Sequence, residues 1–215
     1  MQISGKVFAV TGGGNGIGRE VVLGLVAKGE RVAALDLSEE GLAETVRLAG
    51  ANGDRISTHV VSVTDREAVA ALPAEIIAQH GQVDGLLNIA GIIQKFVPVM
   101  QLEWDQIERV INVNLYGTLT TIKAFLPELV ARPEAALVNV ASMGAYAPVP
   151  GQSVYGATKA AVAQLSRALH SELMETNVAV TGVFPGAIGT NRNINSRIMT
   201  EEQAKQMAAS AGDQA

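Results

Sequence analysis

The feature that most constrains the fold is a glycine-rich segment at residues 11–18, which reads Thr-Gly-Gly-Gly-Asn-Gly-Ile-Gly. It lies between a short apolar run at residues 7–10, which predicts a strand, and residues 17–28, where apolar side chains recur at helical spacing. Glycines at such a junction let the backbone turn sharply and approach a pyrophosphate, whose charge is stabilised by the free N–H groups of the helix N-terminus. A strand, a glycine turn and a helix in this order indicate a dinucleotide-binding unit.

The spacing of these glycines differs from the common dinucleotide pattern G-x-G-x-x-G and instead follows T-G-x-x-x-G-x-G. The alternative interpretation is a tight turn that only joins the strand to the helix. Arg19, on the first turn of the predicted helix, is expected to be a surface or ion-pair residue. From the segment itself we expect cofactor contacts by Gly12, Asn15, Gly16, Ile17 and Gly18.

An acidic residue, Asp36, ends the second predicted strand at residues 31–36. An acid at this distance from the glycine segment can bond the ribose hydroxyls, and its charge repels the 2′-phosphate of NADP. Neither Asn15 nor Leu37 supplies the positive charge that such a phosphate needs. The sequence therefore predicts NAD as the cofactor, with NADP less favoured. The alternative is an acid that only caps the loop before Ser38.

The rest of the chain alternates between strand and helix patterns. Strands are predicted at residues 7–10, 31–36, 56–61, 86–88, 136–141 and 178–184, and helices at 17–28, 38–48, 65–80, 102–129 and 154–174. Pro73 is expected to kink the third helix or split it in two, because proline removes an internal hydrogen bond. The alternation predicts an α/β fold with a doubly wound, Rossmann-type parallel sheet in three layers. No Pro-, Gly- or Ser-rich linker divides the chain, so we expect one domain over residues 1–215.

Charge and composition exclude several classes of protein. The net charge of -5 and the lack of a basic run argue against a nucleic-acid partner. The absence of cysteine excludes disulfides and thiolate chemistry and fits a cytoplasmic location. No segment approaches the roughly 20 apolar residues of a membrane helix, so no membrane partner is expected. The three histidines lack metal-ligand spacing, so no metal is expected either.

Further short motifs follow the glycine segment along the chain. They are Asn88-Ile89-Ala90-Gly91, Asn112-Val113-Asn114, Ser142, the stretch from Tyr155 to Lys159, and residues 185–190, which read Pro-Gly-Ala-Ile-Gly-Thr. Together and in this order they resemble the short-chain dehydrogenase/reductase family, and the resemblance covers nearly the whole chain. It implies an oxidoreductase that moves hydride between a nicotinamide and a small alcohol or carbonyl compound.

The resemblance implies a catalytic set that consists of Asn114, Ser142, Tyr155 and Lys159. Tyr155 and Lys159 are four residues apart and share a helix face, where the cation favours the phenolate form of the tyrosine. Tyr155 is then the expected general acid/base, and Ser142 bonds the same substrate oxygen. By resemblance, Asn114 holds a water that links Lys159 to solvent. Taken singly, these residues also fit a solvated helix face, a cap or a turn.

The resemblance also extends the set of cofactor contacts. It adds Tyr155 and Lys159 at the nicotinamide ribose, Asn88, Ala90 and Gly91 near the adenosine, and Pro185, Gly186, Ile188 and Thr190 in the last loop. Two positions depart from the family pattern. Ser62 stands where many relatives carry an acid for the adenine, and Ile89 replaces an asparagine. Adenine is therefore expected to bind more loosely, or through backbone groups of Ser62 and Val63.

The reaction that follows from these residues is the interconversion of a secondary alcohol and a ketone, or of a primary alcohol and an aldehyde. Apolar residues near the expected mouth favour an apolar substrate, although core packing explains the same residues: Ile92, Ile93, Met143, Ala145 and Val149. Two alternatives stay open. A non-catalytic NAD(H)-binding sensor or scaffold would not need the catalytic set, and an epimerase or dehydratase would usually need additional substrate-domain sequence.

The last part of the chain differs from the family, which usually adds another helix and a seventh parallel strand. The sheet is thus expected to lack its last strand, either because the chain is a shortened form of a longer protein or because a partner covers the open edge. Residues 186–210 are expected to form a substrate loop with a short helix at 200–209. By analogy, a homodimer or homotetramer is expected through the helices at 102–129 and 154–174.

Overall fold

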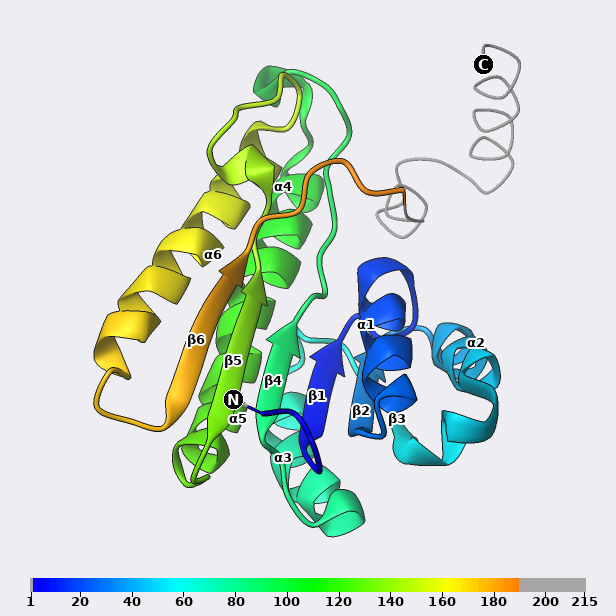
Figure 1. Ribbon diagram of the computed structural model, residues 1–215. Helices are drawn as coiled ribbons and strands as arrows, with labels where there is room; N and C mark the ends of the chain where they lie inside the picture. The colour runs from blue at the N-terminus through cyan, green and yellow to red at the C-terminus, as the bar shows by residue number, and fades with distance from the viewer. Residues whose placement is uncertain (1, 190–215) are drawn as a thin grey trace.

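The computed structural model describes residues 2–189, which form a six-stranded parallel sheet with helices packed against it (Figure 1). The strands are β1 (Val7–Thr11), β2 (Arg31–Asp36), β3 (Ile56–Val60), β4 (Gly85–Asn88), β5 (Ala135–Val140) and β6 (Val178–Val183). The helices are α1 (Gly16–Ala27), α2 (Glu39–Ala49), α3 (Arg66–His80), α4 (Trp104–Ile111), α5 (Thr118–Val130) and α6 (Ser153–Glu172). Short helical turns are η1 (Gly50–Arg55), η2 (Val99–Gln101), η3 (Asn112–Gly117) and η4 (Met143–Ala145). The predicted doubly wound, Rossmann-type fold is confirmed.

The alternation of side chains along the strands explains the helical layers. In β1, Val7 and Ala9 pack into a core cluster with side chains of α3 and α5. Phe8 and Val10, which point to the opposite face, pack with side chains of α1 and α2. A strand that is buried on both faces reads as a continuous apolar run, as β1 does.

The strand order β3-β2-β1-β4-β5-β6 reverses at the centre of the sheet. The chain adds β2 and β3 on one side of β1 and then crosses to β4 on the other side. In open parallel sheets, ligands bind at this reversal, outside the carboxyl ends of the strands. Thr11 and Asn88, the last residues of β1 and β4, lie in register there. The glycine segment after β1 therefore lies beside residues 89–91 after β4.

Helix α3 contains Pro73 but runs without a break over its whole length, so of the two predicted outcomes, a kink or a split, the split is wrong. Proline in a helix interior costs about 3 kcal/mol, because a carbonyl of the preceding turn loses its donor. The neighbouring Val69, Leu72 and Ile76 are buried in the core. Burial of aliphatic side chains of this size contributes roughly 1.5–3 kcal/mol each. Packing against the sheet thus outweighs the lost hydrogen bond.

The helix predicted over residues 102–129 is interrupted near its middle. α4 and α5 are joined by η3, a π-helical turn, and the backbone stays right-handed helical through both junctions. Asn114, one of the predicted catalytic residues, lies in this turn and is fully buried. Single π turns within α-helices occur frequently at functional sites. This one positions Asn114 toward the loop after β4.

Strand β6 is the last strand of the sheet within the described residues. On one of its faces, Ala179, Thr181 and Val183 are exposed, and Figure 1 shows no described helix in front of this part of the sheet. The predicted helix at 200–209 and the question of a seventh strand concern residues outside 2–189. Within 2–189, no helix combines the length and apolar character required to span a bilayer.

Candidate active site

A cavity of about 970 Å³ opens at the carboxyl ends of the strands. This volume lies at the upper end of the range for cofactor and small-molecule sites. Its wall combines the glycine segment, the end of β2, the loops after β3 to β6 and the start of α6. The predicted residues that line it are Gly12, Asn15, Gly16, Ile17, Gly18, Asp36, Ser62, Val63, Ala90, Gly91, Ser142, Tyr155, Lys159, Pro185, Gly186 and Ile188. No three acidic or histidine side chains among residues 2–189 are placed to hold a metal ion.

The glycine segment forms one wall of this cavity and begins α1. Gly12 has φ +73° and Gly16 has φ +51°, both in the left-handed region that favours glycine. A Cβ at Gly18 would lie 2.0 Å from the Gly12 carbonyl oxygen, so no larger residue fits there. The Asn15 side chain caps α1 by accepting the Gly16 N–H at 2.6 Å. Because the first N–H groups of a helix lack intrahelical acceptors, this end of α1 suits a pyrophosphate.

Asp36 holds the loop before Ser38, as one of the two interpretations considered for it expects, and its contact with a ribose stays a prediction. One carboxylate oxygen accepts the Gly14 N–H at 2.9 Å, and the other accepts the Ser38 N–H at 3.0 Å. The carboxylate therefore connects the glycine segment to the turn that begins α2. It also lines the cavity. A carboxylate oxygen can accept more than one hydrogen bond, so these contacts leave capacity for ribose hydroxyls.

Arg19 joins the glycine segment to α2, which corrects the expectation of a surface or ion-pair residue. Its guanidinium donates to the carbonyls of Gly14 and Gly41 and to Thr45 Oγ1. Thr45 in turn donates to the Gly13 carbonyl at 2.9 Å. The long side chain thus holds the cofactor loop in shape through backbone acceptors.

Tyr155 and Lys159 lie one turn apart on the buried face of α6, and both line the cavity. Each keeps only 5% of its surface exposed. The Lys159 Nζ donates to the Val140 carbonyl, at the end of β5, at 2.7 Å. A buried ammonium is tolerated only with such fixed acceptors. Helix α6 therefore brings the phenol and the ammonium to one wall of the cavity, as their spacing predicts.

Asn114 lies next to this pair, one layer behind the cavity wall. Its Oδ1 accepts the Ile92 N–H at 2.9 Å, and its Nδ2 donates to the Ile92 carbonyl at 2.9 Å and to Thr158 Oγ1 at 3.1 Å. A Cβ at Gly91 would lie 3.3 Å from both Asn114 Oδ1 and Lys159 Nζ. The two polar atoms therefore converge beside Gly91, where a side chain would crowd them.

Ser142 follows β5 and caps the short turn η4. Its Oγ accepts the Gly144 N–H at 3.1 Å. A Cβ at Gly144 would lie 3.5 Å from Ser142 Oγ and 3.7 Å from Tyr155 Cε1, so the serine hydroxyl and the tyrosine ring both lie close to this glycine. The Ser142 oxygen acts as an acceptor in this bond, so its own proton can be donated to a substrate.

One of the predicted cofactor contacts among residues 2–189, Asn88, does not line the cavity. Asn88 is buried, and its amide bonds to Asn139 Oδ1 at 2.9 Å and to the Thr121 hydroxyl at 2.7 Å. These bonds connect β4 to β5 and α5, so Asn88 supports the sheet beneath the cavity. Thr190 lies outside the described residues. Its contact with the cofactor stays a prediction.

The sequence reasoning missed Gln94, a fully buried residue in the loop after β4. Its Oε1 accepts the Tyr155 N–H at 2.8 Å, and its Nε2 donates to the Gly151 carbonyl at 3.0 Å. Gln94 thus fixes the first turn of α6 to the loop after β4. A glutamine directly after Ile92 and Ile93 is a signal of a buried polar residue, but it does not reveal a partner 61 positions away.

Comparison with known proteins identifies the family. Residues 6–201 match the short chain dehydrogenase family model, and the chain belongs to this family. The 3-oxoacyl-acyl-carrier-protein reductase FabG of Thermotoga maritima is 33% identical over 192 residues, which cover 88% of this chain and 77% of FabG. NAD+-bound xylitol dehydrogenase matches with 30% identity and a TM-score of 0.82, over 86% of this chain and 72% of that one. Serine dehydrogenase complexed with NADP+ matches with 29% identity and a TM-score of 0.85, over 93% and 80%. These relatives support a nicotinamide-dependent oxidoreductase.

Proposed function

We propose that the protein interconverts a secondary alcohol and a ketone, or a primary alcohol and an aldehyde, with NAD as its cofactor. One observation carries this proposal: Tyr155, Lys159 and Ser142 line the same cavity as the glycine segment and Asp36. Bound NAD would supply a nicotinamide ring that accepts or gives a hydride. The residues of this chain would bind it, hold the substrate oxygen and move the proton.

Tyr155 is the proton-transferring group in this mechanism. In the oxidative direction its phenolate oxygen takes the hydroxyl proton of the alcohol, and in the reductive direction the phenol returns a proton to the carbonyl oxygen. Lys159, one turn further along the same face of α6, lines the same cavity and would bind the nicotinamide ribose. The Ser142 hydroxyl donates to the same substrate oxygen and stabilises the charge that develops on it.

Asn114 and Gln94 act through their neighbours. Asn114 Oδ1 lies close to Lys159 Nζ beside Gly91, and we assign to it the placement of a water that passes protons between Lys159 and solvent. Gln94 holds the backbone of Tyr155 itself. Both residues therefore position the proton-transferring pair and do not exchange protons with the substrate.

The preference for NAD rests on charge at the end of β2. The Asp36 carboxylate lines the cavity, where it would repel the 2′-phosphate of NADP. The adjacent cation, Arg19, donates to two carbonyls and a hydroxyl of the loop and α2. Relatives of known structure include both NAD and NADP complexes, so family membership alone does not decide between the two cofactors.

The test is a screen of secondary alcohols with NAD and with NADP, in which the absorbance of the reduced cofactor is followed. We expect turnover with NAD, and a loss of roughly 10²–10⁴-fold in kcat for Tyr155→Phe with little change in cofactor affinity. Tyr116→Phe, which removes an exposed phenol, is the matched control. Equal turnover by the wild type and Tyr155→Phe would contradict the mechanism, and a strong preference for NADP would contradict the argument from Asp36. Cofactor binding without turnover of any substrate would favour the sensor or scaffold.

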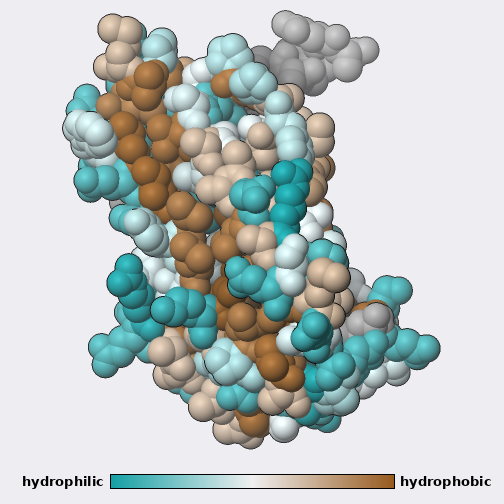
Figure 2. Space-filling view, turned by 90° about the vertical axis from the view of Figure 1, so that its left-hand side faces the viewer, coloured by the Kyte–Doolittle hydropathy of each residue, from teal (hydrophilic) through white to brown (hydrophobic). Residues whose placement is uncertain are grey.

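We also propose a homodimer or homotetramer that forms through the side of the molecule where α6 lies. Figure 2 shows apolar residues gathered in a band down this side. Large contiguous apolar patches are uncommon on soluble monomers and often mark interfaces. Light scattering after size-exclusion chromatography measures the assembly, and a monomer at micromolar concentration would contradict the proposal.

A further inference from the structure

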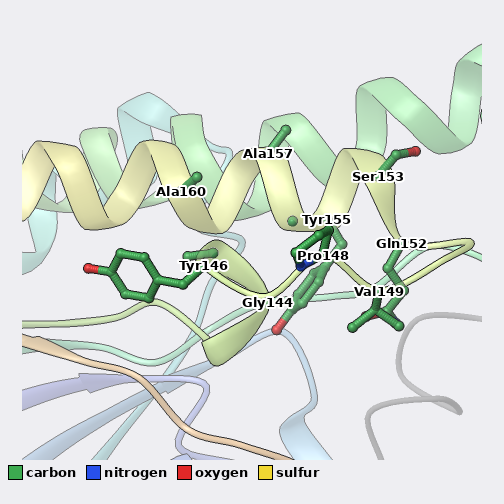
Figure 3. A pocket seen from close by; sticks show the side chains of 11 residues that line it. Gly144, Tyr146, Pro148, Val149, Gln152, Ser153, Tyr155, Ala157 and Ala160 are labelled. Atoms are coloured by element: carbon green, nitrogen blue, oxygen red, sulfur yellow. The ribbon is translucent and has the colours of Figure 1, made fainter.

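A second, smaller cavity shares Tyr155 with the large one. It has a volume of about 350 Å³ and lies between the loop after β5 and the first turns of α6 (Figure 3). Tyr155 belongs to the walls of both cavities, and Figure 3 shows its ring extending from α6 toward Gly144. Much of the remaining wall is apolar, with contributions from Ala145, Pro148, Val149, Ala157 and Ala160. A group bound in this cavity would therefore lie against the proton-transferring residue.

One polar group in this wall lacks a partner. Gln152 precedes α6 directly and keeps only 7% of its surface exposed. Within the described part of the chain, its buried Nε2 makes no hydrogen bond. Gln94, the other buried glutamine near the start of α6, has both ends of its amide bonded. Since buried amide groups in native proteins are nearly always paired, the Gln152 N–H groups indicate an acceptor that does not belong to residues 2–189.

We propose that the smaller cavity is a substrate subsite, in which Gln152 Nε2 donates a hydrogen bond to a neutral oxygen on an apolar part of the substrate. The inference rests on the proposed function and narrows the substrate to an alcohol or ketone that carries a second carbonyl or ester oxygen. A neutral oxygen is favoured because the residues that line the cavity include no lysine or arginine. A carboxylate would find no basic side chain in this wall with which to pair.

The size of the cavity limits the group that it admits. A volume of about 350 Å³ lies at the lower end of the range for ligand sites, so it suits a short chain. The apolar wall accepts the carbon atoms, and Gln152 fixes the position of the one oxygen among them. Tyr155, in the same wall, would then meet the reacting oxygen at the other end of the substrate.

The experiment measures binding in complexes that cannot react. With saturating NAD, the oxidised cofactor cannot reduce a ketone, so calorimetry gives the Kd of each ketone without turnover. The probes are ethyl acetoacetate, ethyl levulinate and ethyl 5-oxohexanoate, which place an ester at three distances from the ketone. Their matched partners are 2-heptanone, 2-octanone and 2-nonanone, which have the same chain lengths and lack the ester.

We expect at least one keto ester to bind the wild type roughly threefold to tenfold more tightly than its matched ketone, as one neutral hydrogen bond allows. Gln152→Met should abolish this preference and leave the Kd of NAD unchanged, and Gln152→Leu serves as a second variant if the first does not fold. Gln164→Met, at an exposed position of the same helix, should keep the preference.

Two results would overturn the subsite. One is a preference that persists in Gln152→Met, and the other is a wild type that binds all three esters no better than the plain ketones, in which case water alone fills the site. The proposed function is tested in a separate assay, in which an absence of ketone reduction with NADH would contradict it. The binding difference is measured without that reaction.

Discussion

Gln94→Met tests how the site is held together, because this side chain is buried and lines neither cavity. Methionine keeps an unbranched chain of similar length but removes the acceptor of the Tyr155 N–H and the donor to the Gly151 carbonyl. A buried backbone group without a partner costs roughly 1–3 kcal/mol. The bond to Tyr155 is fully buried, whereas the bond to Gly151 is partly exposed and water can replace part of it. We therefore expect a loss of about 2–4 kcal/mol in the free energy of unfolding.

Urea-induced unfolding, followed by circular dichroism without cofactor, measures this loss. Gln101→Met, at an exposed position, is the matched control and should stay within about 0.5 kcal/mol of the wild type. Because the first turn of α6 is loosened, kcat should fall while the KM for NAD changes little. A change below about 1 kcal/mol, together with an unchanged kcat in Gln94→Met, would refute the positioning role.

Gly91→Ala should lower kcat roughly tenfold or more, because the added Cβ would lie 3.3 Å from Asn114 Oδ1 and Lys159 Nζ. Steady-state kinetics measure this loss, and thermal unfolding checks that the variant stays folded. Asp84→Ala should lower the free energy of unfolding in urea by about 3 kcal/mol, because this buried carboxylate bonds the Arg132 guanidinium. It should leave kcat unchanged, because Asp84 lies at the start of β4, far from the cavity. Burial lowers the pKa of His59 and of His80 below 6.5, so the unfolded chain takes up these protons first. The contribution of the two neutral histidines to the free energy of unfolding should be complete above about pH 6.5 and be lost as the pH falls below it. The free energy of unfolding should therefore decrease less between about pH 7.5 and about pH 5.5 in the double variant His59→Gln/His80→Gln than in the wild type.

Interactions between residues that are close in sequence could be predicted well. The glycine segment lies within a single turn, and its geometry follows from a strand, a turn and a helix in succession. The spacing of Tyr155 and Lys159 predicted one helix face in the same way. The order of six strands and their helices was enough for the doubly wound fold, because connections in parallel sheets obey strict handedness.

Interactions between distant residues could not be predicted in this way. The contacts of Gln94 with the start of α6 and of Arg19 with α2 appear only when separate elements pack together. At Pro73, the split that the rule for isolated helices allowed does not occur, because the helix is buried against the sheet. The unpartnered amide of Gln152 is a property of packing alone.

The π turn at Asn112–Gly117 restricts how this helix can change during evolution or engineering. Such a turn holds an extra residue, and removing one residue would restore ordinary α-helical winding. The α-helical segments on either side would keep their orientation relative to each other, because the widened turn is what accommodates the extra residue. The widened turn that places Asn114 would be lost, and its amide would leave its place beside the Ile92 backbone. Single-residue deletions should therefore be far less tolerated here than substitutions at the exposed positions of the same helix.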